Sequence, residues 1–303
     1  MKAMQKPQQA QSLSMAQLLQ MLEMTQTVTE RPNATAWIGT PQTEPRDRVF
    51  GGLQLAQAIV AAGNTVPETQ ELLTLQADFL QGVPTDSPLT WIVEDVASTP
   101  NASARRSSII NDDGNQLFTA LTRWSTLRAD LPSHKPTQPL TSVASPDDLP
   151  SLHDRFHDDD RIPLWWRMNR PINPHPVSAP PYVSHVEQGD TQSTLLRPAG
   201  EVPNDPVIQA ALVGYATDMS ILEPAFRATG AMRHAPDSRI LTMTHALTFH
   251  QIPDWSTWLH FDAKLEALSH GRAFGSGEVF SPAGEHLVSA SQVGFVKLGG
   301  RSV

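Results

Sequence analysis

Apolar residues recur at the spacing of a helix face in two separate parts of the chain, residues 50–66 and residues 208–222. In each stretch they fall three or four positions apart, which places them on one side of an α-helix and predicts that this side is buried. The later stripe consists of Ile208, Leu212, Tyr215, Met219 and Leu222. Gly51 and Gly52 stand at the start of the earlier helix and allow another group to approach it closely.

Strand-like runs separated by turn signals follow each of these helices. After the first helix they cover residues 72–80, 89–97, 102–110 and 116–125, and after the second, residues 239–251, 256–268, 271–280 and 286–296. Short connections such as Asp113-Gly114 join neighbouring runs, and strands joined by so short a turn pair in the antiparallel sense. Each half of the chain is therefore predicted to combine one long apolar helix with an antiparallel sheet, an α+β fold.

A single shift of 170 positions superposes the two halves. It matches identical residues in the same order and spacing: Phe79 with Phe249, Leu89 with Leu259, Gly114 with Gly284 and Leu117 with Leu287. Such a match indicates a duplicated domain. The simplest way to bury each helix is to wrap its sheet around it, and we expect the two sheets to merge edge to edge. The predicted boundaries are 13–126 for the first domain, 127–189 for a connection and 190–303 for the second domain.

The predicted connection, residues 127–189, is rich in Pro, Asp and His, which is typical of an irregular segment on the surface. Its tryptophan pair, Trp165-Trp166, is expected to pin it to the domains. His153 and His157 stand four residues apart beside carboxylates, a spacing that a zinc site would allow. In such a segment a solvated face is the favoured interpretation, so we expect no metal and no other cofactor.

Charge and composition narrow the classes of function. The formal net charge of −9 at pH 7 argues against a nucleic-acid partner, which needs a basic face. The chain has no cysteine, which excludes disulfides, thiolate metal sites and a cysteine nucleophile. No run approaches the roughly 20 apolar residues of a membrane span, and the N-terminus MKAMQKPQQAQ lacks the apolar core of a secretion signal. These features predict a soluble cytoplasmic protein.

The two copies differ at positions where the second copy carries polar side chains that could take part in catalysis. Asp218 lies on the flank of the second helix stripe, where the pattern of the first helix has about Ala62, and the shift pairs Gln292 with Thr122. Thr242 lies early in a later strand. A carboxylate, a hydroxyl and an amide gathered at one centre can hold a water molecule and accept its proton, which suffices for hydrolysis without a covalent nucleophile. Taken singly, each residue also fits an ordinary structural role.

Several ordered motifs resemble those of one enzyme family, the type II acyl-CoA thioesterases (TesB-like). The motifs are RVFGGLQLAQAIVAAGNTV (48–66), LQADFLQ (75–81), YATDMSIL (215–222), LTMTHALTFH (241–250) and SASQVGF (289–295). The similarity runs from about residue 14 to residue 297 and weakens through the connection. The resemblance implies a double hotdog fold, an enzyme that hydrolyses fatty acyl-CoA to free fatty acid and CoA, and assembly as a homodimer or homotetramer.

The resemblance also implies roles for individual residues. The family's catalytic aspartate, hydroxyl residue and glutamine fall on Asp218, Thr242 and Gln292, which would bind and activate the attacking water with Asp218 as the base. A donor near the helix start, at Gly51 and Gly52, or Gln292 itself, would polarise the thioester carbonyl. The candidate walls of an apolar slot for the acyl chain are Tyr215, Met219 and Met243. The candidates for contacts with the CoA phosphates are Arg105, Arg106 and Arg272.

Four residues depart from the usual family pattern. Leu53 replaces Gln, Gln76 lies near a usual His, Thr244 replaces Asp and Val293 replaces Glu. The departures bear on substrate preference and rate but leave the three predicted catalytic residues in place. His245, next to Thr244 in a strand, is interpreted as a packed structural histidine.

Two other functions fit the same fold. A non-catalytic acyl-CoA-binding module would bind the thioester without releasing a thiol. A hotdog hydratase acting on enoyl-CoA would pair an aspartate with a histidine a few residues further on, whereas Asp218 is followed by MSILE. The hydratase therefore ranks behind the thioesterase and the binding module.

Overall fold

The computed structural model describes residues 12–42, 47–134, 137, 146–186 and 188–300. The N-terminal residues considered for targeting and the last three residues of the second predicted domain lie outside this part. The first half contains α1 (Met15–Leu22), β1 (Thr25–Thr27), β2 (Ala34–Gly39), α2 (Gly51–Gly63), β3 (Gln70–Phe79), β4 (Leu89–Thr99), β5 (Ala102–Ile110) and β6 (Gln116–Thr126). The predicted connection contains the 3-10 helix η1 (Pro146–Asp148), α3 (Leu152–Phe156), α4 (Leu164–Arg167) and β7 (Ile172–Pro176). The second half contains β8 (Thr191–Pro198), α5 (Pro206–Thr217), α6 (Pro224–Thr229), β9 (Arg239–Phe249), β10 (Leu259–Ser269), β11 (Arg272–Phe280) and β12 (His286–Lys297).

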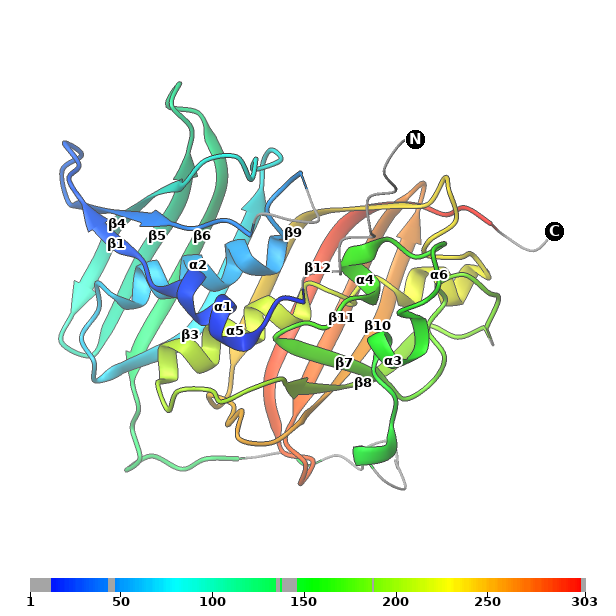
Figure 1. Cartoon of the computed structure of the whole chain (residues 1–303). Coiled ribbons are helices and arrows are strands. Elements are labelled where there is room, and N and C mark those ends of the chain that lie inside the picture. The colour runs from blue at the N-terminus through cyan, green and yellow to red at the C-terminus, as the bar shows by residue number, and fades with distance from the viewer. Residues whose placement is uncertain (1–11, 43–46, 135–136, 138–145, 187, 301–303) are drawn as a thin grey trace.

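The described strands form one continuous sheet in the order β1-β2-β4-β5-β6-β3-β9-β12-β11-β10-β8-β7 (Figure 1). The shift of 170 positions reappears in its register, because the β4–β5 and β10–β11 pairs carry a bulge at the same place, after Asp95 and after Leu265 (95 + 170 = 265). β3 and β9 join the copies, with Gln76 opposite Ala246 (76 + 170 = 246). The two halves are thus related by a pseudo-twofold axis through this pair, and their sheets merge edge to edge as expected.

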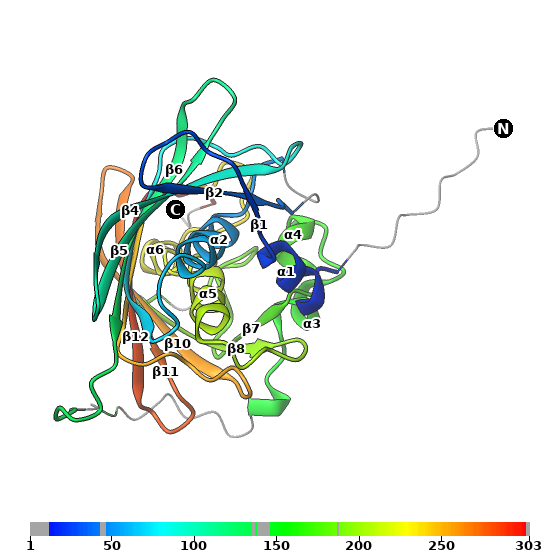
Figure 2. The ribbon, with the colours of Figure 1, turned by 90° about the vertical axis from the view of Figure 1, so that its left-hand side faces the viewer.

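The curved sheet encloses the two long helices. Seen end on, α2 and α5 lie against each other inside the curve of the sheet (Figure 2). A Cβ atom on Gly52 would lie 2.4 Å from the backbone oxygen of Tyr215, and one on Gly214 would lie 3.2 Å from the Cβ atom of Leu55. The close approach that the glycine pair predicts at the start of α2 is therefore made, at Gly52, by α5.

Helix α5 ends before its apolar stripe does. Asp205 caps its N-terminus by accepting hydrogen bonds from two N–H groups of the first turn. The helix ends at Thr217, with Asp218 as the C-cap residue. Met219 and Leu222 lie in the turn that follows, and both remain buried there. A continuous helix into α6 is disfavoured, because α6 begins with Pro224, which has no N–H for the helical ladder.

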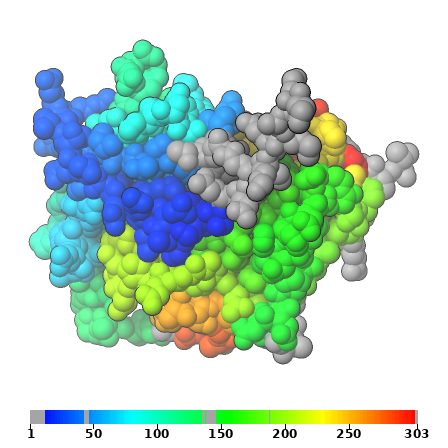
Figure 3. All heavy atoms as spheres, in the orientation of Figure 1, coloured from blue at the N-terminus to red at the C-terminus, as the bar shows by residue number. Residues whose placement is uncertain are grey.

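The connection predicted as irregular is partly regular and contributes to the core. Its strand β7 extends the sheet by pairing with β8. Trp165 packs against Phe50 with ring centroids 5.3 Å apart, and Trp166 is also buried. The segment (green) lies beside the N-terminal residues (dark blue) on one face of the molecule (Figure 3), where the Leu13 N–H donates to the Asn169 oxygen at 3.2 Å. Its apolar side chains, rather than its Pro and Asp content, fix its position.

Within the described ranges, no helix is long and apolar enough to cross a membrane. Those residues also hold no group of three or more His, Cys, Asp or Glu side chains arranged for a metal ion. The rings of His153 and His157 are 5.2 Å apart, but Nδ1 of His153 faces the Arg167 oxygen at 2.8 Å and Nε2 of His157 pairs with Asp158 at 3.0 Å. These two histidines are thus engaged by protein groups.

Candidate active site

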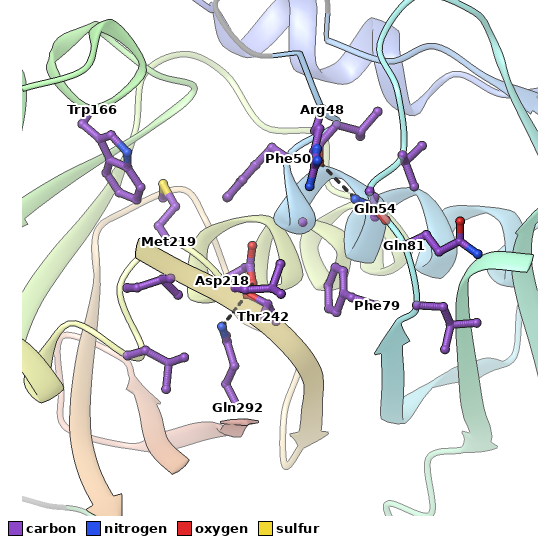
Figure 4. A pocket seen from close by; sticks show the side chains of 18 of the residues that line it. Arg48, Phe50, Gln54, Phe79, Gln81, Trp166, Asp218, Met219, Thr242 and Gln292 are labelled. Atoms are coloured by element: carbon purple, nitrogen blue, oxygen red, sulfur yellow. Dashed lines mark hydrogen bonds between the residues drawn. The ribbon is translucent and has the colours of Figure 1, made fainter. Parts of the chain in front are cut away.

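A pocket of about 290 Å³ lies where the two copies meet. The start of α2 and the end of β3 line it from the first copy, and the turn after α5 together with β9 and β12 lines it from the second. Asp218, Thr242 and Gln292 all line this pocket, and Phe79 lies beside them (Figure 4). The structure therefore brings together the three residues that the sequence comparison of the copies singled out.

Asp218 lies between the ends of two helices. It is the C-cap of α5, and its carboxylate reaches the first turn of α2, because a Cβ atom on Gly51 would lie 2.5 Å from Asp218 Oδ2. A glycine is required at this position to leave room for the carboxylate. The N-terminal end of a helix carries a partial positive charge, so α2 attracts the negative charge placed there. Asp218 is half-buried and remains open to the pocket.

Thr242 and Gln292 extend from adjacent strands and join Asp218 in a chain of hydrogen bonds. The Gln292 amide donates from Nε2 to Thr242 Oγ1 at 2.8 Å, and the Thr242 hydroxyl donates to Asp218 Oδ1 at 3.3 Å. Gln292 is 2% exposed, so its amide is held almost entirely by protein groups. The chain fixes where the carboxylate, the hydroxyl and the amide lie relative to one another.

A β-bulge in β9 turns Thr242 toward the pocket. Opposite β12, Val293 pairs with Thr244 and the next residue, Gly294, pairs with Thr242, so Met243 is an extra residue on β9. Without the bulge, Thr242 would share the outer face of the sheet with Thr244, two positions away. The bulge reverses this alternation, so Thr242 faces inward and Met243, 49% exposed, faces outward.

His245 is bound to the catalytic candidates rather than packed only among apolar groups. It is fully buried opposite Gln292, and its Nδ1 lies 2.8 Å from Gln292 Oε1. Its Nε2 lies 3.2 Å from the hydroxyl of Thr217. Burial is the main reason that the pKa of His245 is lowered, while Asp218 and Gln292 act in the opposite direction. The sequence interpretation missed this contact. The sequence feature that pointed to it is the difference between the copies, because the position equivalent to His245 in the first copy (75 + 170 = 245) is the apolar Leu75.

The other predicted substrate contacts are partly displaced. Met219 and Gly51 line the pocket as expected. Tyr215 is buried behind Phe50, with its ring edge-on at 5.3 Å, and does not line the pocket. Gly52 is covered by α5, and Met243 faces outward because of the bulge. The residues that do form the apolar wall include Phe79, Leu80, Trp166, Leu222, Ile240 and Leu241.

The predicted phosphate contacts lie elsewhere. Arg105 is buried, and its guanidinium donates to Thr65 Oγ1 at 2.9 Å and to Asp95 Oδ1 at 2.8 Å, so it serves the interior of the first copy. Arg106 pairs with Glu94 at 3.5 Å on the exposed side of the sheet. Neither of them, nor Arg272, lines the pocket. The pocket is lined instead by two other cations, Arg48 and Arg233.

The four departures from the family pattern spare the pocket lining. None of Leu53, Gln76, Thr244 and Val293 contributes to the wall of the pocket. Leu53 is buried in α2, and Gln76 and Val293 are exposed. Val293 and Thr244 are cross-strand partners on the outer side of the bulge.

A buried polar cluster supports the pocket wall. Arg170 donates to the sulfur of Met219 at 3.0 Å, and nearby Glu223 accepts a hydrogen bond from Tyr182 at 3.0 Å. Burial raises the pKa of Glu223. The ring of His234 packs against Tyr182, and burial, followed by two neighbouring arginines, lowers the pKa of His234 to about 3.

A duplicated helix-in-sheet fold of this kind is the double hotdog class, and its pocket gathers a carboxylate, a hydroxyl and an amide. Residues 169–295 match the family model described as "Acyl-CoA thioesterase", and residues 40–125 match the "Acyl-CoA thioesterase N-terminal domain". Acyl-CoA thioesterase 2 of Haemophilus influenzae is 24% identical over 267 residues, which cover 82% of this chain and 88% of that protein.

Solved structures agree with this assignment at the level of the fold. The tesB protein of Mycobacterium avium subsp. paratuberculosis has a TM-score of 0.74 at 24% identity, covering 94% of this chain and 99% of that one. The acyl-CoA thioesterase II TesB2 of Mycobacterium marinum has a TM-score of 0.72 at 21% identity, covering 93% and 98%. The chain belongs to the acyl-CoA thioesterase family and is a thioester hydrolase.

Proposed function

We propose that this protein hydrolyses fatty acyl-CoA at the described pocket, with Asp218 as the general base and with Thr242 and Gln292 orienting the attacking water. The observation that carries the proposal is the directed chain from the Gln292 amide through the Thr242 hydroxyl to the Asp218 carboxylate. A water molecule beside this chain can donate its proton to the carboxylate while its oxygen faces the substrate. No covalent intermediate is needed.

The start of α2 supplies the second requirement, a group that stabilises the oxyanion. The first N–H groups of a helix have no acceptor within the helix, and they carry the positive end of its dipole. Gly51, the first residue of α2, lies next to Asp218, so a thioester carbonyl placed at this helix start would meet an N–H donor on one side and the activated water on the other. Attack gives a tetrahedral intermediate, which collapses to the fatty acid and expels the CoA thiolate; the proton held by Asp218 neutralises the products.

The rest of the pocket suits the two parts of the substrate. Phe79, Leu80 and Leu222 provide apolar surface for an acyl group. Arg48 and Arg233 line the same pocket and offer positive charge to the CoA phosphates, although the chain as a whole is acidic. The predicted self-association of the chain stays a prediction.

Thiol release from acyl-CoA, followed with a thiol-reactive chromogen, tests the proposal, and the absence of cysteine keeps the protein from contributing to the signal. Asp218→Asn keeps the shape of the side chain but removes the base, so turnover should fall at least about 100-fold while the melting temperature stays close to that of the wild type. Unchanged turnover in this variant would refute the mechanism. Saturable binding of acyl-CoA by the wild type without thiol release would instead identify a binding module.

A further inference from the structure

The hydrogen-bond chain at the pocket continues past Gln292 to a buried histidine. We propose that His245 is a positioning residue, which holds the Gln292 amide in the one orientation that lets Thr242 donate to Asp218. This inference rests on the proposed function and adds a residue that acts on the water through two others. Its evidence is the polarity of each hydrogen bond and the comparison with the first copy.

The polarity follows from the carboxylate. An ionised Asp218 only accepts, so the single hydroxyl proton of Thr242 must point to it for the 3.3 Å contact to be a hydrogen bond. Thr242 Oγ1 can then only accept from Gln292, which requires the NH₂ group of the amide at 2.8 Å. The amide oxygen is thereby directed to Nδ1 of His245, also at 2.8 Å.

In this orientation of the amide, His245 must donate a hydrogen bond to the amide oxygen. Because Gln292 Oε1 only accepts, Nδ1 of His245 carries the proton. The neutral ring then offers Nε2 as an acceptor to the Thr217 hydroxyl at 3.2 Å, whose alternative acceptor is the Val213 oxygen at 2.9 Å. If the amide were reversed, its oxygen would take the Thr242 proton, and the Asp218 carboxylate would lose that donor.

The first copy shows that the fold itself does not require a histidine here. Leu75 occupies the equivalent position (75 + 170 = 245) and pairs with Thr122 in the register in which His245 pairs with Gln292. Leu75 is fully buried like His245. An apolar side chain therefore satisfies the sheet at this position, and the polar ring is found only in the copy that carries the amide.

A double-mutant cycle tests the inference. His245→Leu installs the residue of the first copy and should lower kcat for thiol release by on the order of 10-fold with little change in KM, because the amide is free to turn. His245→Asn keeps a donor near the position of Nδ1 and should recover part of that loss. In a Gln292→Ala background, His245→Leu should change kcat by less than about 2-fold, because its route to the water is already broken. The matched control, Leu75→Val in the first copy, should leave kcat unchanged.

Two results would overturn the inference. One is an equal fall in kcat on His245→Leu with and without Gln292, which would mean that the histidine acts through general structure. The other comes from ¹⁵N spectra of the histidine-labelled wild type, with the His245 signals assigned by their absence in whichever variant folds. These spectra must show a protonated Nδ1 and an unprotonated Nε2, and the opposite tautomer contradicts the chain. The spectra do not depend on enzymatic activity. Failure of the proposed function is therefore recognised separately, because in that case the wild type releases no thiol from acyl-CoA.

Discussion

The contact between Gly51 and Asp218 makes a single methyl group a sharp probe of the site. In Gly51→Ala, the new Cβ atom would lie 2.5 Å from Asp218 Oδ2 and 3.1 Å from Phe79 Cε1. Real Cβ atoms do not approach an oxygen so closely, so the carboxylate must move by most of an ångström. That movement displaces it relative to Thr242, whose hydrogen bond to Asp218 Oδ1 is 3.3 Å long.

The expected effects on activity and stability differ in size. Displacement of a reacting group by about 1 Å costs about 100-fold in rate, so kcat should fall by that order. The backbone of Gly51 is helical, so alanine is allowed there and gains up to about 1 kcal/mol in helix propensity. This offsets part of the roughly 1–3 kcal/mol that overpacking costs, and the free energy of unfolding should change by less than about 2 kcal/mol.

Gly52→Ala is the matched control for this variant. Its Cβ atom would meet the backbone oxygen of Tyr215 at 2.4 Å, so it pushes α2 and α5 apart without touching the carboxylate. We expect Gly52→Ala to lose mainly stability and Gly51→Ala to lose mainly turnover, as measured by thiol release and urea unfolding of both variants. Wild-type turnover in Gly51→Ala, or losses of stability and turnover in the same proportion in both variants, would refute the reasoning.

Two further predictions concern the pocket mouth and the buried cluster. Arg48→Ala should raise KM for acyl-CoA about 10-fold at low salt and less at high salt, since salt screens the attraction between the guanidinium and the CoA phosphates. The control Arg106→Ala, on the other side of the sheet, should leave KM unchanged. Equal effects of the two variants on KM would mean that the phosphates bind elsewhere. Because the pKa of His234 is lowered to about 3, the unfolded chain alone gains a proton as the pH falls below 6.5. Stability should therefore decline on acidification, by about 2 kcal/mol from this group at pH 5. His234→Phe should show a smaller loss between pH 7.5 and pH 5 in urea unfolding, and an equal loss would contradict the assignment.

Much of the fold was predictable from the sequence, because the two copies share identical residues at the same spacing. The match of Phe79 with Phe249 and of the other paired residues indicates strands of equal length joined by turns of equal length. The register of the sheet shows the same shift of 170 positions. The predicted trio of Asp218, Thr242 and Gln292 also meets in one pocket. Comparison of the copies was informative here, because a side chain whose chemistry differs between them is not dictated by the fold that both share.

The bulge explains why the prediction failed for Met243. Counting alternate positions along β9 from the buried His245 places Met243 inside and Thr242 outside. The extra residue reverses this order. The bulge could not be predicted from the sequence of β9 alone, because a bulge is defined by the pairing with the partner strand. The first copy has its bulge at the equivalent place, beside Leu73.

The placement of Arg105 was not predictable for a related reason. An arginine in a strand is usually exposed, and burial depends on partners that the sequence alone does not bring together. Here the partners are Thr65, just after the end of α2, and Asp95 on the neighbouring strand. In the connection, the expectation that Trp165 and Trp166 hold the segment in place agrees with their burial, whereas its proline-rich composition concealed the short helices and strand β7.

The joining of both copies into one chain through β3 and β9 has a consequence for how the protein can change. In an assembly of identical chains, every substitution appears on both sides of the symmetry axis, so an improvement on one side can be a defect on the other. Here each side is encoded separately, and Leu75 faces Thr122 where its counterpart has His245 facing Gln292. Away from the residues that line the pocket, the interior of the first copy is therefore a region in which stabilising substitutions can be introduced while the second copy keeps its sequence.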